Sequence, residues 1–170
     1  LSAIYSGSWT GKHSVTEFNA GVTLGLREFG SDNAAFEARR SGSSGDFIYY
    51  RGDLSYTRDL PAGFQYFGKA QAQLSSLPLV DTEQFSGGGL GTARGYLEGE
   101  AAGDNALFGS VELRSPSLAG WLGEKSGEWR FYAFGDAGVL GVEHALPGQT
   151  GEFDLISVGL GSRLSLRNHF

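Results

Sequence analysis

Apolar and polar residues alternate over several long segments of the chain. Within the segment Thr16–Arg27, the even-numbered positions from Phe18 to Leu26 are apolar, and the odd-numbered positions are polar or glycine. A period of two places successive side chains on opposite faces of a β-strand. This segment is therefore predicted to be a strand with one apolar face.

The same alternation recurs along the rest of the sequence, which predicts seven strands in all. The further segments are Phe47–Thr57, Phe64–Ser75, Leu107–Arg114, Arg130–Val142 and Ile156–Leu166, with a more ragged one at Leu1–Thr10. Strands of soluble proteins average about five or six residues, whereas a tilted strand needs roughly nine to eleven to cross a membrane. Several of these segments reach the longer range.

The polar face of these segments differs from the outer face of an ordinary soluble sheet. In Ile156–Leu166 it consists of small residues and a single arginine, namely Ser157, Gly159, Gly161, Arg163 and Ser165. A face in bulk water is usually richer in Lys and Glu, so this composition favours a confined aqueous lumen. A soluble β-sandwich that acts as a binding module is the alternative.

The connections between the segments differ in length. Short ones, at Thr10–Val15 and Asp59–Gly63, alternate with long ones, at Phe29–Gly45 and Leu77–Ala106, although the later connections are intermediate. Tight turns at one end and longer loops at the other are typical of outer-membrane barrels. Seven strands cannot close a bacterial single-chain barrel, because such barrels have an even number of strands. We therefore expect an all-β, antiparallel transmembrane β-barrel of which residues 1–170 form only a portion.

Composition excludes several classes of function. The net charge is -6 and the isoelectric point is near 5.0, which argues against nucleic-acid binding. The absence of Cys removes disulfides and thiolate metal sites. His13, His144 and His169 are too scattered in sequence to suggest a metal site.

No catalytic motif is visible in the sequence. The segment GGGLG at Gly87–Gly91 lacks the Gly-Lys-Ser/Thr ending of a phosphate-binding loop. No G-x-S-x-G motif places a nucleophile on a sharp turn. We therefore expect no enzymatic activity, no cofactor, no metal and no small-molecule substrate, and a β-barrel lipase or protease is only a distant alternative.

The glycine-rich connection carries one arginine, Arg94, near its centre. On the segment Arg130–Val142, Asp136 falls on the polar face, which would point into a lumen. A carboxylate there would favour a cation, and the loop could fold inward to bring Arg94 to it. Alternatively, Arg94 is solvated outside and Asp136 pairs with Arg130 or Arg114.

The stretch EQFSGGGLGTARGYLEGEAAGDNALFGSVELRSP is similar to the sixth extracellular loop and following strand of the Omp85 superfamily, whose loop tip reads V-R-G-Y/F. Downstream, FGDAG resembles the F-x-D-x-G strand motif of the same superfamily. The E-x-F-x-x-G-G beginning and the E-L-R-x-P end look most like the two-partner secretion transporters of the haemolysin and haemagglutinin type. One departure is Ala93, where Val is usual.

The resemblance implies a barrel of sixteen strands preceded by periplasmic domains. The seven segments would be its eighth to fourteenth strands, and the loop 77–106 would lie in the lumen. Residues 1–170 would then be part of the C-terminal barrel domain, with the periplasmic domains and the first and last barrel strands outside this sequence.

The resemblance also implies residue roles and a function. Arg94, Gly95, Tyr96 and Asp136 would hold the loop, supported by Gly87, Gly88, Phe134 and Gly138. The protein would lie among the lipids of a Gram-negative outer membrane and export an unfolded partner polypeptide, without catalysis of its own. An insertase of the same superfamily, which folds barrels into the membrane, is the alternative.

Overall fold

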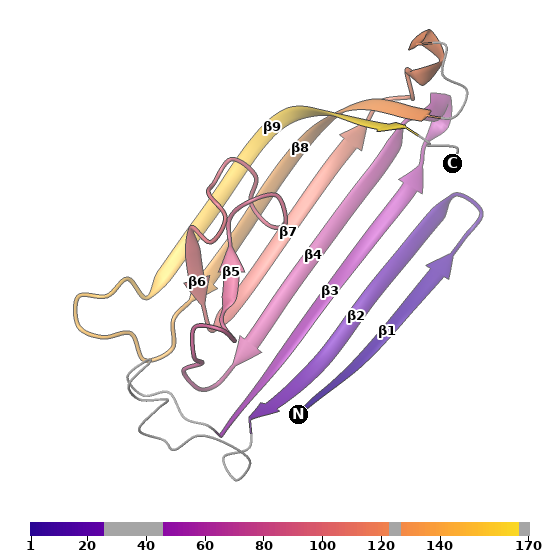
Figure 1. Ribbon diagram of the computed structural model, residues 1–170. Helices are drawn as coiled ribbons and strands as arrows, with labels where there is room; N and C mark the ends of the chain where they lie inside the picture. The colour runs from indigo at the N-terminus through magenta and orange to yellow at the C-terminus, as the bar shows by residue number, and fades with distance from the viewer. Residues whose placement is uncertain (26–45, 123–126, 167–170) are drawn as a thin grey trace.

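The computed structural model describes residues 1–25, 46–122 and 127–166, and most of them form one curved antiparallel sheet (Figure 1). Seven strands pair in the order β1-β2-β3-β4-β7-β8-β9. Their bounds are β1 Ser2–Thr10, β2 Ser14–Gly25, β3 Phe47–Asp59, β4 Gln65–Ser75, β7 Asn105–Arg114, β8 Gly127–Gly141 and β9 Glu152–Leu166. The seven predicted strands and their antiparallel arrangement are confirmed.

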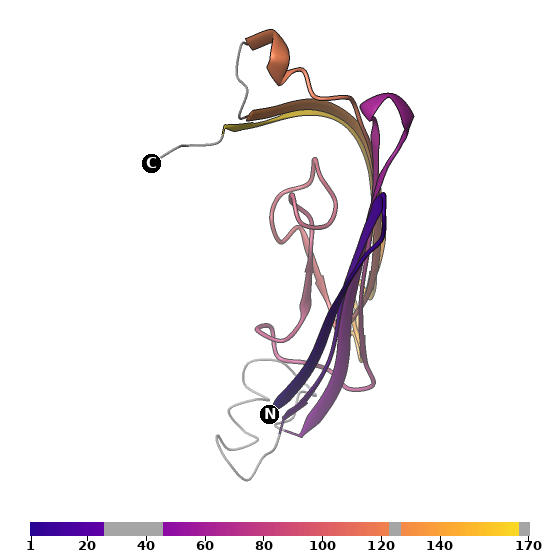
Figure 2. The same cartoon turned by 90° about the vertical axis from the view of Figure 1, so that its right-hand side faces the viewer.

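Each strand pairs with the next long strand of the chain, as in the wall of an up-and-down barrel. Two 3-10 turns, η2 (Pro61–Gly63) and η3 (Ala119–Leu122), lie in connections at one end of the sheet. Figure 2 shows that the sheet bends and that the connection between β4 and β7 lies on its concave side. None of the helical segments in the described ranges has the length and hydropathy needed to cross a membrane.

The register of the strands places the predicted apolar positions on the convex face. One row across the sheet consists of Phe18, Leu54, Ala70, Gly109, Ala137 and Ile156. On β9 this face is highly exposed, with Val158 at 82% and Leu160 at 85%. A continuous apolar surface is costly in water and favourable in lipid. The alternation therefore separates an apolar convex surface from a polar concave one.

The strand ends differ most from the sequence-based prediction at the start of two strands. β8 begins at Gly127 and β9 at Glu152, earlier than the predicted Arg130 and Ile156. On β9 the charged Glu152 and Asp154 occupy apolar positions and interrupt the alternation, but pairing with β8 continues. At the start of β8 the Trp129 indole donates a 2.9 Å hydrogen bond to Ser162. The predicted strand positions 26–27 and the long connection 29–45 lie outside the described residues.

The connection between β4 and β7 contains two short strands that the sequence did not predict, β5 (Phe85–Gly87) and β6 (Ala101–Gly103). Together they form a narrow ribbon against the concave face (Figures 1 and 2). The buried apolar cluster of the molecule lies between this ribbon and the wall. Its members are Phe85, Ala93, Ala101, Ala106, Phe108, Leu140 and Leu155. The loop thus packs against the wall over an apolar contact.

Candidate functional site

The loop reverses direction several times to bring its tip to the wall. Gly88, Gly89, Gly95 and Gly99 all have positive φ angles, between 72° and 103°. This left-handed region is strained for residues with a side chain. At Gly88 a Cβ atom would also lie 2.3 Å from the carbonyl oxygen of Leu97. The glycine content is therefore what allows the loop to fold back on itself.

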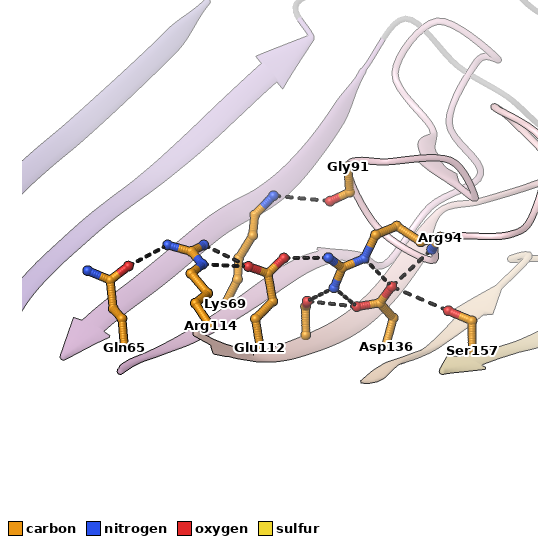
Figure 3. Close-up of polar contacts among 9 residues, drawn as sticks. Gln65, Lys69, Gly91, Arg94, Glu112, Arg114, Asp136 and Ser157 are labelled. Carbon is orange, nitrogen blue, oxygen red and sulfur yellow. Dashed lines mark hydrogen bonds and ion pairs between the residues drawn. The ribbon is translucent and has the colours of Figure 1, made fainter. Parts of the chain in front are cut away.

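Arg94 at the loop tip contacts Asp136 of β8, as Figure 3 shows. Its Nη2 lies 2.6 Å from Oδ1 of Asp136 and its Nε lies 2.9 Å from Oδ2. The backbone N–H of Arg94 donates a further bond of 3.0 Å to Oδ2. The two side chains are 11% and 1% exposed. Asp136 thus accepts a two-pronged guanidinium contact and a main-chain bond from the same residue.

A second carboxylate, Glu112 of β7, completes the binding of the guanidinium. Nη1 of Arg94 donates to Oε1 of Glu112, whose side chain is 4% exposed. Ser110 accepts a 3.0 Å bond from Nη2 and donates a 2.7 Å bond to Asp136. Glu112 and Ser110 were not predicted as site residues, although parity places both on the polar face of the predicted strand Leu107–Arg114.

The charges around Arg94 alternate in sign. Nη2 of Arg114 lies 2.7 Å from the other carboxylate oxygen of Glu112. The row of four contacting side chains, Asp136, Arg94, Glu112 and Arg114, therefore has no net charge (Figure 3). The pKa of Arg94 is raised above its usual value, mainly by its hydrogen bond to Asp136 and also by Glu112, against the effect of burial. Arg94 therefore remains charged in the site.

The alternative pairings for Asp136 that the sequence left open do not form. Arg114 pairs with Glu112, and Arg130 pairs with Glu128 at 2.5 Å. The loop lies against Asp136, and its own Arg94 binds both oxygens of that carboxylate.

Two aromatic residues also hold the loop tip. The guanidinium carbon of Arg94 lies 3.7 Å from the ring centre of Phe134, a distance suited to a cation–π contact. The hydroxyl of Tyr96 donates to the carbonyl of Ile156 at 3.2 Å and accepts from its N–H at 3.3 Å. Tyr96 therefore joins the loop to the backbone of β9.

Two of the glycines that the resemblance singled out make room for one ring. A Cβ atom at Gly138 would lie 2.1 Å from the Phe108 ring, and one at Gly87 would lie 2.8 Å from it. Phe108 stacks on Phe85 of the loop with ring centres 5.5 Å apart. The structure thus places the eight predicted site residues in the loop turns, at the Arg94 contact, against the backbone of β9 or beneath Phe108.

A second set of contacts, which was not predicted from the sequence, lies at the base of the loop. The fully buried Gln73 of β4 donates its amide to the carbonyl oxygens of Glu83 and Asp104, both at 3.1 Å. Arg51 of β3 donates a 2.6 Å bond to the Gln73 side-chain oxygen. The carboxylate of Asp104, also fully buried, accepts from the backbone N–H of Leu79 at 2.8 Å.

The arrangement is suited to fixing a segment of chain. The oxygens of Asp136 and Glu112 are engaged by guanidinium, hydroxyl and main-chain donors. Within the described ranges, no group of three or more His, Cys, Asp or Glu residues is placed to bind a metal ion. What the contacts achieve is to hold the tip and the base of the loop against the concave wall.

Comparisons with known proteins find the same fold and show the family. The chain is similar to CdiB from Escherichia coli, with a TM-score of 0.73 and 24% identity over 95% of this chain. The match spans 30% of the CdiB chain, so these residues correspond to under a third of its length. A search of the curated proteins finds no match. The profile of the haemolysin secretion/activation proteins ShlB/FhaC/HecB matches residues 2–164, and the chain therefore belongs to this family of two-partner secretion proteins.

Proposed function

We propose that this chain is part of the barrel of a transporter that exports an unfolded partner polypeptide through a Gram-negative outer membrane. The family and the outer-membrane location of its members support this function. Family membership also favours export over the insertion of barrels into the membrane. Residues 1–170 would supply seven strands of the wall, and the periplasmic domains and remaining strands would lie elsewhere in a longer protein.

The observation that carries the proposal is the position of the loop. Its tip, with Arg94 between Asp136 and Glu112, lies on the concave polar face, which becomes the lumen once the barrel is complete. Any chain that crosses this lumen must pass the loop. The loop 77–106 would therefore control the width of the pathway.

The strength of the Arg94 contact is compatible with such a role. Removing one partner of a fully buried ion pair costs about 3 to 5 kcal/mol, because the other charge is left unpaired. A wet lumen would reduce this cost to roughly 1 to 3 kcal/mol. The contact is then strong enough to hold the loop at rest, and weak enough to be exchanged for other contacts during transport.

Site-specific photocrosslinking tests the proposed pathway. Leu90 on the loop and Leu160 on the convex face are both 85% exposed, so they form a matched pair. A photoreactive amino acid is placed at one or the other position in the full-length protein, during arrested export of a polypeptide that depends on it. We expect the exported chain to crosslink to position 90 and not to position 160. Equal crosslinking at both positions, or none at position 90, would contradict a pathway along the concave face.

A further inference from the structure

A cleft on the concave face separates the loop tip from the part of the wall nearest the short turns. It has a volume of about 410 Å³. Residues 90–92 of the loop form one side, and Phe67, Lys69, Arg114, Tyr132 and Arg163 of the strands line the other. Aromatic rings and cations of the wall therefore line a space large enough for an extended side chain.

The cations of this cleft differ in their partners. Arg94 and Arg114 are paired with carboxylates, as described above. Lys69 donates a 3.1 Å hydrogen bond to the carbonyl of Gly91, and Arg163 lies 5.4 Å from the ring centre of Tyr132. In the described part of the chain, neither Lys69 nor Arg163 forms an ion pair with a carboxylate. The cleft thus has an excess of positive charge.

The cationic surface continues toward the short-turn end. Arg130 is the register partner of Arg163 and also faces the concave side. Its carboxylate partner Glu128 is 55% exposed, and its Nη1 is held by the carbonyl oxygens of Gly63 and Ser115. An anion that enters from this end would therefore meet Arg130 and Arg163 side by side, before it reached the loop tip.

We propose that Lys69, Arg163 and the ring of Tyr132 form a carboxylate-binding site for acidic side chains of the polypeptide that crosses the lumen. The inference rests on the proposed function and adds a chemical preference to it. Arg163 presents a planar fork that matches a carboxylate, and Tyr132 supports its flat face. Lys69 lines the same cleft and adds a second donor, an ammonium group on a flexible stem.

The site is suited to transient binding. Arg163 is exposed, and ion pairs of exposed side chains contribute on the order of 1 kcal/mol. A passing acidic side chain would be held briefly and then released, since stronger binding would stop the chain. The site therefore selects acidic segments for passage without trapping them.

Block of ion current tests the site directly. The full-length protein that contains this chain is placed in a planar bilayer, and decaglutamate is added on the short-turn side. We expect decaglutamate to reduce the current and Arg163→Gln or Lys69→Gln to weaken this block about five-fold each, the change that corresponds to about 1 kcal/mol. Arg163→Lys, which keeps the charge, should retain most of the block.

The control variant is Arg58→Gln. Arg58 lies on β3 with its side chain on the convex face, because it shares a register row with Tyr66 and Leu113. This change removes the same charge from the protein, and decaglutamate should block the variant as well as it blocks the original. Similar weakening by Arg58→Gln and Arg163→Gln would overturn the site, as would equal block by decalysine.

The outcomes for the site and for the proposed function are separable. Charge-dependent block through Arg163, without any crosslink from position 90 to an exported chain, would support the site and contradict the transport function. Crosslinks from position 90, with a block that does not depend on Arg163 or Lys69, would support transport and overturn the carboxylate site.

Discussion

The guanidinium of Arg94 binds the carboxylate of Asp136 through two nitrogen atoms, although 42 positions separate the residues in the chain. The same guanidinium also reaches Glu112 on the neighbouring strand. One loop residue is therefore bound to two adjacent strands of the wall. The planar guanidinium places its N–H donors at fixed positions, and these positions match the two carboxylates.

The first prediction concerns that fork. Arg94→Lys keeps the positive charge but cannot donate to Asp136, Glu112 and Ser110 at once from fixed positions. We expect the loop to be cleaved faster by protease in the folded protein, while the barrel stays inserted. Arg58→Lys on the convex face is the control. Equal protection of the loop in wild type and Arg94→Lys would show that charge alone is sufficient.

The second prediction concerns the glycine beneath Phe108. Gly138→Ala puts a methyl group where the Phe108 ring lies, at 2.1 Å. Displacing this ring from its stack with Phe85 should destabilise the protein by about 1 to 3 kcal/mol, as overpacking usually does. The midpoint of thermal unfolding in detergent measures this. Gly109→Ala is the matched control, because nothing lies within 4 Å of a Cβ atom there, and a larger loss for the control would contradict the account.

The third prediction concerns the two faces of β9. Leu160→Lys places a charge on the convex face, where it should cost roughly 2 to 4 kcal/mol near the bilayer midplane and less toward its edges. Ser157→Lys is on the concave face and should leave insertion intact. Because Ser157 bonds to Asp136 at 3.3 Å, the new ammonium should instead compete with Arg94 and loosen the loop. Membrane fractionation and heat stability measure insertion, and normal insertion of Leu160→Lys would oppose the lipid-facing assignment.

The fourth prediction concerns the base of the loop. Gln73→Ala would leave the carbonyl oxygens of Glu83 and Asp104 without the amide that joins them. Losing these hydrogen bonds in a buried site should cost on the order of 1 to 3 kcal/mol. Hydrogen exchange should therefore rise around residues 79–84 and 104, while the Arg94 contact persists. The half-buried Gln71, two residues away on the same face, is the control, and an equal rise in Gln71→Ala would contradict a specific role for Gln73.

The alternation in the sequence was sufficient to predict the wall, whereas one contact of the site was predicted only as one of two alternatives. Alternation assigned the two faces of β9 correctly, because a membrane barrel has apolar residues on one side and polar ones on the other. The pairing of Arg94 with Asp136 was one of two open interpretations from the residues, and only the resemblance favoured it.

Other parts of the site could not be predicted because they depend on pairing and docking. Glu112 is brought beside Arg94 by the register of β7 with β8, which alternation alone does not fix. Gln73 and Gln71 look identical by parity, and only the docked loop buries Gln73. The same holds for β5 and β6, whose three-residue strands are too short to give a period.

The most direct test of the central claim is a double-mutant cycle on Arg94 and Asp136. The free energy of loop opening is measured by native-state proteolysis in Arg94→Ala, Asp136→Ala and the double variant. Because both single changes break the same contact, we expect the double variant to lose at least about 1 kcal/mol less than the sum of the single losses. Losses that add within about 0.5 kcal/mol would show that Arg94 and Asp136 act independently and would contradict a loop held by this pair.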